Sequence, residues 1–142
     1  MKRTDSLMRL KRFRVDDLKR RMGTLDGMKS DLERKLTDLE DNVAREKQRA
    51  NDSDIGRLAF PSFLKSIESR RENLRATLKE IERERAQCQD ELNAAFQDLK
   101  SLELAVDQQV KRAAEIEARR SQSRIDEMAI VRHLRKHAMR GA

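Results

Sequence analysis

The chain has 142 residues, of which 42% are charged, 37% hydrophobic and 3% aromatic, and its formal net charge is +7. This composition cannot fill the thick core of a globular enzyme, but it can fill a narrow seam between helices flanked by solvated charge. No stretch approaches the ~20 apolar residues of a membrane span, no apolar block follows the basic start, and the single cysteine excludes an internal disulfide. We therefore expect a cytoplasmic protein.

The first predicted element is a helix over residues 4–50, in which apolar residues recur in alternating steps of three and four. Such spacing places them on one face, where they form the seam of a coiled coil. Two lysines interrupt the seam, which costs stability but fixes the register of the paired helices. The predicted seam consists of Met8, Lys11, Val15, Leu18, Met22, Leu25, Lys29, Leu32, Leu36, Leu39 and Val43.

A polar segment over residues 51–61 follows and is predicted to be a loop, because it holds Gly56 and the only proline, Pro61. Proline suits the first turn of a helix, so the second helix is expected over residues 62–139. Beyond Val106 its apolar stripe loosens. The predicted seam of this helix consists of Leu64, Ile67, Arg71, Leu74, Leu78, Ile81, Arg85, Cys88, Leu92, Ala95, Leu99, Leu102 and Val106.

Two such stripes joined by one short segment predict an all-α fold, a two-helix antiparallel coiled-coil hairpin with a longer C-terminal helix, in a single domain over residues 1–142. If the turn centres on Gly56, residue i faces about residue 112 − i. The last ~30 residues would then lack a partner, and a lone amphipathic helix is marginal in water. We expect them to fray or to dock into another molecule.

Charge is concentrated at the two ends of the chain. Residues 1–21 hold nine Lys/Arg against three Asp/Glu, residues 111–142 hold nine against four, and residues 22–110 hold fifteen against nineteen. Some apolar residues near the ends, such as Leu10, Phe13 and Ile130, lie off the predicted seam. A basic end of this kind suits a partner with an acidic or polar lumen, anionic lipid, nucleic acid, or simple solvation.

The opposite end of the predicted hairpin carries the apolar cluster Phe60, Phe63, Leu64 and Ile67. Phe63 and Ile67 are one helical turn apart on the same face. Packing at the turn and a partner-binding patch both account for such a cluster, and the sequence leaves the two open.

The sequence shows no motif that indicates catalysis. There is no Gly-rich phosphate loop, and Cys88 falls on the seam, where a buried apolar role is favoured over a reactive thiol. His133 and His137 are spaced to grip a metal, but no third ligand lies nearby and the surrounding arginines repel cations. We therefore predict no enzymatic activity, no metal and no cofactor.

The opening Leu7-Met-Arg-Leu-Lys-Arg-Phe13, one short loop about a third of the way along, and Phe63-Leu-Lys-Ser-Ile67 at the start of a longer second helix resemble the FliJ family of flagellar type III export. The resemblance implies a cytoplasmic coiled coil similar to the central stalk subunit of rotary ATPases. It would insert its terminal end into the hexameric export ATPase, contact the cytoplasmic domain of the export-gate membrane protein at the inner membrane, and escort export chaperones.

Carried onto this chain, the resemblance implies two contact sets. The terminal set for the ATPase ring is Arg9, Arg12, Phe13, Arg14 and Leu18. The set for the export gate is Phe63 and Ile67, an aromatic residue and an aliphatic one four later, although other members also carry Trp and Tyr near the loop and this chain has neither.

Two rival hypotheses remain beside the export component. One is a basic coiled coil that binds nucleic acid or an anionic membrane, although the aromatic platform of single-strand binders is missing. The other is a self-associating scaffold, whereas the hairpin hypothesis predicts a monomer with no specific affinity for nucleic acid.

Overall fold

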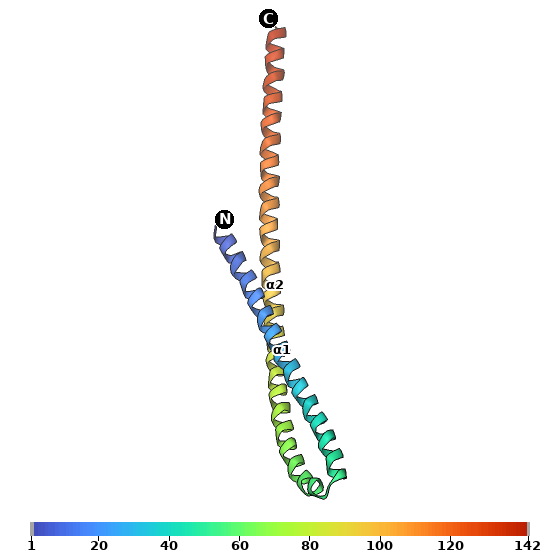
Figure 1. The fold of residues 1–142 in the computed structure, drawn as a ribbon. Coiled ribbons are helices and arrows are strands. Elements are labelled where there is room, and N and C mark those ends of the chain that lie inside the picture. Colours follow the sequence, from blue (N-terminus) through green and yellow to red (C-terminus); the bar gives the residue numbers. More distant parts are fainter. Residues whose placement is uncertain (1, 142) are drawn as a thin grey trace. The chain divides into compact units, whose positions relative to one another are not determined.

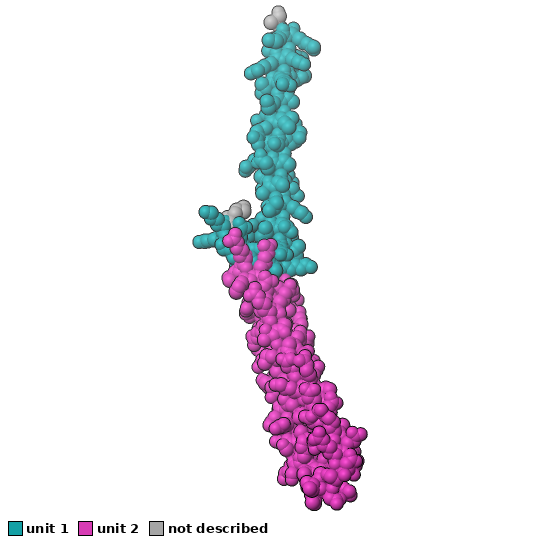
Figure 2. Space-filling view, in the orientation of Figure 1, with its two compact units in different colours: residues 1–8, 98–142 teal, residues 9–97 magenta. Residues whose placement is uncertain are grey.

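The computed structural model describes residues 2–141, which form two long helices, α1 (Lys2–Asp52) and α2 (Asp54–Arg140), and no strand (Figure 1). The predicted all-α fold is confirmed. The chain divides into two compact units: residues 9–97 form one, and residues 1–8 with 98–142 form the other (Figure 2). That the whole chain is a single domain stays a prediction, and the two units are described separately below.

In the unit of residues 9–97, α1 and the first half of α2 lie side by side and run in opposite directions (Figure 1). Leu18 and Cys88 are the most deeply buried large side chains, and the Cys88 thiol donates a hydrogen bond to the Leu18 carbonyl oxygen at 3.6 Å. The buried seam of this unit consists of Val15, Leu18, Met22, Leu25, Leu32, Leu39, Ile67, Ile81, Cys88, Leu92 and Ala95, with Ala50 near the turn. Except for Ala50, each was predicted from the three-and-four spacing.

The polar positions of the predicted seam are half-buried, and three of them form ion pairs between the helices. These pairs are Lys29–Glu82 at 3.9 Å, Arg71–Glu40 at 2.8 Å, and Arg85–Asp26. The side chains remain partly exposed, so each pair contributes only about 0.2–1 kcal/mol. Their main consequence is alignment, because a slipped register would place these charges beside apolar groups.

The register agrees with the pairing predicted from Gly56 at some contacts between the helices and departs from it at others. The expected partner of Asp26 is about residue 86, and the observed one is Arg85. The expected partner of Glu40 is about residue 72, and the observed one is Arg71.

Nearer the N-terminus the prediction is wrong: the expected partners of Leu18 and Arg14 are about residues 94 and 98, and the observed ones are Cys88 and Glu91. The difference has the sign expected when the turn lies at Ser53 and not at Gly56.

The predicted loop over residues 51–61 is wrong. Ser53 is the one described residue between the helices that is not helical, and α2 begins at Asp54, eight residues earlier than expected. The Ser53 hydroxyl oxygen accepts a hydrogen bond from the Gly56 amide at 3.0 Å, and its carbonyl accepts one from the Arg57 amide at 3.1 Å. Ser53 is thus an N-cap, and the negative charge of Asp54 in the first turn interacts favourably with the positive end of the helix dipole.

Pro61 lies inside α2 rather than at its start. An interior proline removes one backbone hydrogen bond and its ring clashes with the preceding turn, which bends a helix. In Figure 1 the first turns of α2 are seen nearly along their axis at the foot of the hairpin, whereas the next part of the helix runs beside α1. Pro61 therefore belongs to the helical stretch at the start of α2 that the sequence analysis predicts to be a loop.

The other unit contains residues 2–8 of α1 and residues 98–141 of α2. Its half-buried apolar residues are Met8, Leu99, Leu102 and Val106, all of which belong to the predicted seam. From residue 107 to residue 141 every residue is exposed, although the helix continues to Arg140. The loosening of the apolar stripe after Val106 therefore coincides with the loss of burial.

Candidate interaction surfaces

The first candidate surface lies near the N-terminus of α1, at the end of the residue 9–97 unit away from the turn. Arg9, Arg12 and Phe13 are exposed, with Phe13 at 60%. Arg14 is also exposed and forms an ion pair with Glu91 across the hairpin at 3.6 Å. Leu18 differs from the other four predicted ring residues because it is 1% exposed and belongs to the seam.

The second candidate surface lies at the turn of the same unit. Phe63 is half-buried, and its ring stacks on Phe60 with 6.4 Å between centroids. Ile67 is 3% exposed, so the predicted gate pair is split between the edge of the hairpin and its seam. The i, i+4 spacing places Phe63 and Ile67 on one face of α2. This face packs against α1.

Sequence reasoning missed the most exposed apolar residues of this turn, Ile55 and Leu58, which are 82% and 83% exposed. They lie one turn apart in the first stretch of α2, where the Ser53 cap holds the helix start and Arg57 pairs with Asp54 at 3.2 Å. We call Ile55, Leu58, Phe60 and Phe63 the tip patch. The signal that was available is the capping serine followed by two aliphatic residues three apart.

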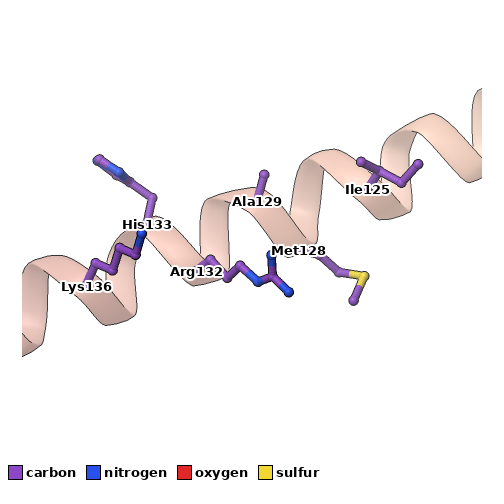
Figure 3. A pocket seen from close by; sticks show the side chains of 6 residues that line it. All are labelled: Ile125, Met128, Ala129, Arg132, His133 and Lys136. Atoms are coloured by element: carbon purple, nitrogen blue, oxygen red, sulfur yellow. The ribbon is translucent and has the colours of Figure 1, made fainter.

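The third candidate surface is the exposed part of α2 from residue 107 onward. It is both basic and apolar: residues 111–142 hold nine Lys/Arg against four Asp/Glu. Its exposed large hydrophobic residues are Val110, Ile116, Ile125, Met128, Ile130, Val131, Leu134 and Met139. Figure 3 shows part of this surface, where side chains from residue 125 to residue 136 surround a shallow hollow on a single helix.

No group of three or more His, Cys, Asp or Glu side chains among residues 2–141 is placed to hold a metal ion. The rings of His133 and His137 pack edge to face with centroids 5.1 Å apart. The one cysteine is buried in the seam. No helix in the described part of the chain combines the length and apolarity needed to cross a membrane.

The antiparallel hairpin, its alternating seam and its exposed apolar and basic surfaces define an α-helical protein of the coiled-coil class. The family model of the flagellar FliJ protein matches residues 1–138, and the chain therefore belongs to the FliJ family. Membership makes it a component of the flagellar export apparatus. Comparison with curated proteins and with solved structures returned no match.

Proposed function

We propose that the chain is a non-enzymatic, stalk-like component of flagellar export that binds the hexameric export ATPase through its terminal end and the export gate through its turn. The observation that carries this proposal is the separation of two exposed surfaces within residues 9–97. Basic and apolar side chains, Arg9, Arg12 and Phe13, lie at one end, and the tip patch lies at the other. A stiff hairpin with a different surface at each end suits a link between two partners.

For the ATPase contact, we propose that Arg9, Arg12 and Phe13 touch the ring directly, with Arg14 beside them. Exposed arginines and an exposed aromatic ring are the residue types that dominate the energy of protein interfaces. Leu18 would act indirectly, because its burial against Cys88 holds the two helices together beneath the contacting residues. A difference between faces of the hairpin would let it act unequally on the six ATPase subunits.

For the gate contact, we propose that Phe63 and the exposed Ile55 and Leu58 meet the cytoplasmic domain of the gate protein. Ile67 would support Phe63 from within the seam, since it is too buried to touch a partner while the hairpin is closed. Two aliphatic side chains at the tip offer an apolar contact where other family members carry Trp and Tyr. The protein would then work in the cytoplasm, peripherally at the inner membrane, and it would also escort export chaperones.

The test is co-purification with the export ATPase and stimulation of ATP hydrolysis. The double substitution Arg9→Glu with Arg12→Glu should weaken ring binding at least tenfold, because it reverses two exposed charges at the contact. Arg75→Glu with Lys79→Glu makes the same charge change on an exposed middle part of α2 and should leave binding intact. Equal binding by the two variants would count against the proposed terminal contact.

The gate contact is tested separately with the purified cytoplasmic domain of the gate protein. Ile55→Ser with Leu58→Ser should abolish most of the binding and leave the melting temperature unchanged, because both side chains are already exposed to water. Ile67→Ala should instead lower the melting temperature, because it opens a cavity in the seam. Retained gate binding by the Ile55/Leu58 variant would remove the tip patch from the contact.

The excess of exposed basic residues beyond residue 107 keeps nucleic acid or anionic membrane as a second candidate partner. Affinity for DNA or anionic vesicles that survives physiological salt would favour this alternative, whereas binding that salt abolishes is expected of any cationic protein. Sedimentation separates both hypotheses from a self-associating scaffold, because the export component is expected to be a monomer on its own.

A further inference from the structure

The exposed stretch of α2 beyond Val106 divides into two parts of different charge. Residues 107–127 hold five Lys/Arg and five Asp/Glu, whereas residues 128–140, which we call the distal segment, hold four Lys/Arg and no Asp/Glu. The four cations are Arg132, Arg135, Lys136 and Arg140. None of them forms an ion pair with another residue of the described range 2–141. The distal segment therefore presents positive charge that the chain itself does not neutralise.

The distal segment is also amphipathic. At 3.6 residues per turn, its side chains fall into two halves of the helix circumference. One half, the apolar face, holds Met128, Ile130, Val131, Leu134, Ala138 and Met139. The other half, the polar face, holds Ala129, Arg132, His133, Lys136, His137 and Arg140. The five large hydrophobic residues of the apolar face are 47–84% exposed. In Figure 3, Met128 lies on one side of the helix, and Ala129 and His133 lie on the other.

Arg135 is the one charged residue that falls within the apolar face. A long arginine side chain can lay its methylene stem along an apolar surface while its guanidinium reaches a polar layer. At the surface of a bilayer, that polar layer consists of phosphate groups, which guanidinium binds well. Arg135 is therefore compatible with an apolar face that enters lipid only to the depth of the headgroups.

The combination of charge and amphipathicity favours a lipid surface over other partners. Nucleic acid would pair with the cations but would leave the apolar face in water. Two copies of the distal segment would each bring four Lys/Arg and no Asp/Glu, and like charges oppose that pairing. A protein groove gains most of its binding energy from a few anchors, typically aromatic residues or arginine, whereas this apolar face has no aromatic residue. A basic amphipathic helix with an aliphatic face suits the boundary of an anionic bilayer.

We propose that the distal segment binds the surface of an anionic phospholipid bilayer. The helix axis lies in the membrane plane, the apolar face is buried at the boundary of the acyl chains, and the cations attract the anionic headgroups. The inference goes beyond the proposed ring and gate contacts, which lie within residues 9–97 and do not use this segment. Lipid contact also stabilises a helix that gains nothing from packing while every side chain is exposed.

The test measures co-sedimentation of the full-length chain with vesicles at physiological salt. The vesicles contain either phosphatidylcholine alone or phosphatidylcholine mixed with phosphatidylglycerol, and the chain should bind the anionic mixture roughly tenfold more tightly or better. Val131→Ser with Leu134→Ser should weaken this binding roughly tenfold, because it removes two side chains from the buried face. Arg132→Glu with Lys136→Glu should weaken it by a similar factor, roughly tenfold, because it reverses two charges that attract the headgroups.

Each variant has a matched control in the electrically balanced part of the same helix. Val110→Ser with Ile116→Ser removes two exposed apolar side chains there, and Lys111→Glu with Arg112→Glu makes the same charge change. Both controls should bind anionic vesicles several-fold more tightly than the distal variants they match. Circular dichroism of the four free variants should show equal helicity, which separates loss of lipid contact from fraying.

A single tryptophan reports which side of the helix meets lipid, because the chain has no tryptophan of its own. Leu134→Trp places the indole on the apolar face, and its fluorescence should shift to shorter wavelength on anionic vesicles. Ala129→Trp places it on the polar face, and its emission should stay that of an indole in water. Equal shifts at the two positions would contradict the proposed orientation.

Other results overturn the inference in distinguishable ways. Absence of vesicle binding does so directly. If distal variants and their controls lose binding equally, the vesicles attract the charge of the whole chain and not this segment. If only the charge reversal matters, the apolar face does not enter the bilayer. Dimerisation in sedimentation that Val131→Ser with Leu134→Ser abolishes would assign the face to a second copy. The proposed function is unaffected by the vesicle results, because the assay contains neither the export ATPase nor the gate protein.

Discussion

The two stretches of α2 on either side of Val106 contrast in burial. Between residues 67 and 95 the helix buries Ile67, Ile81, Cys88, Leu92 and Ala95 against α1, whereas every residue from 107 to 141 is exposed. Both stretches are helical and both carry apolar residues at short intervals. The contrast shows that helical periodicity alone does not distinguish a buried seam from an exposed apolar surface. What distinguishes them is whether another helix presents its own apolar face to the first.

Hydrogen exchange should reveal this contrast as the largest effect. Backbone amides between residues 67 and 95 should exchange only with opening of the hairpin, whereas those between residues 115 and 138 should exchange many-fold faster, because no tertiary contact protects that helix. Mass spectrometry of peptic fragments measures both. Similar protection in the two stretches of the isolated chain would show that the exposed stretch is stabilised by something other than packing.

The same substitution placed in the two regions should give opposite outcomes. Leu18→Ala removes one of the most deeply buried side chains and should cost about 2–5 kcal/mol of unfolding free energy. Leu134→Ala removes a side chain that is already exposed and should change the free energy by less than about 0.5 kcal/mol. Urea denaturation measures both values, and comparable losses would contradict the assignment of Leu18 to the seam.

Two glycines, Gly56 near the turn and Gly23 within α1, should respond differently to an added methyl group. A Cβ on Gly56 would lie 2.8 Å from the Ser53 hydroxyl oxygen and 3.0 Å from the Arg49 carbonyl oxygen, so Gly56→Ala should destabilise the hairpin by about 1–3 kcal/mol. A Cβ on Gly23 would meet nothing within 4 Å, so Gly23→Ala should stabilise it by about 1 kcal/mol. Thermal melts of the two variants should shift in opposite directions, and a tolerated Gly56→Ala would mean that the close approach at the turn relaxes freely.

The smallest expected effect concerns Arg71, whose Nε is buried without a hydrogen-bond partner while its Nη2 pairs with Glu40. Arg71→Leu should leave stability within about 1 kcal/mol of the unaltered chain, since the lost pair is weak and an unsatisfied buried group disappears. Equilibrium denaturation measures the change. A loss well beyond this range would show that the Arg71–Glu40 pair stabilises the seam rather than merely aligning it.

Much of the fold follows from local sequence rules. Every position of the two predicted seams is buried or half-buried, because apolar spacing and helical geometry together fix which face packs. The register follows only in part, because a pairing centred on Gly56 misplaces the partners of Leu18 and Arg14 by six or seven residues. The turn does not follow, because Pro61 predicts a helix start and gives no sign of the capping serine eight residues earlier, which satisfies the first amides of α2.

The candidate surfaces were less predictable for a physical reason. Spacing by four places Phe63 and Ile67 on one face, but it cannot say whether that face meets α1 or a partner, and here Ile67 meets α1. The resemblance predicts Leu18 for the terminal contact, but this side chain is buried in the seam. Ile55 and Leu58 fall in the predicted loop, where no helical pattern assigns side chains to a face, but they belong to α2.

The position of Cys88 makes its thiol a natural probe of the separation of α1 from α2. The sequence has no other thiol, and this one is 1% exposed, with its hydrogen directed to the backbone of the opposite helix. An alkylating reagent can reach it only when the pair separates, so the labelling rate of the natural protein counts separation events without any engineered probe. A partner that binds the closed hairpin should lower the alkylation rate of Cys88, and a partner that separates the two helices should raise it.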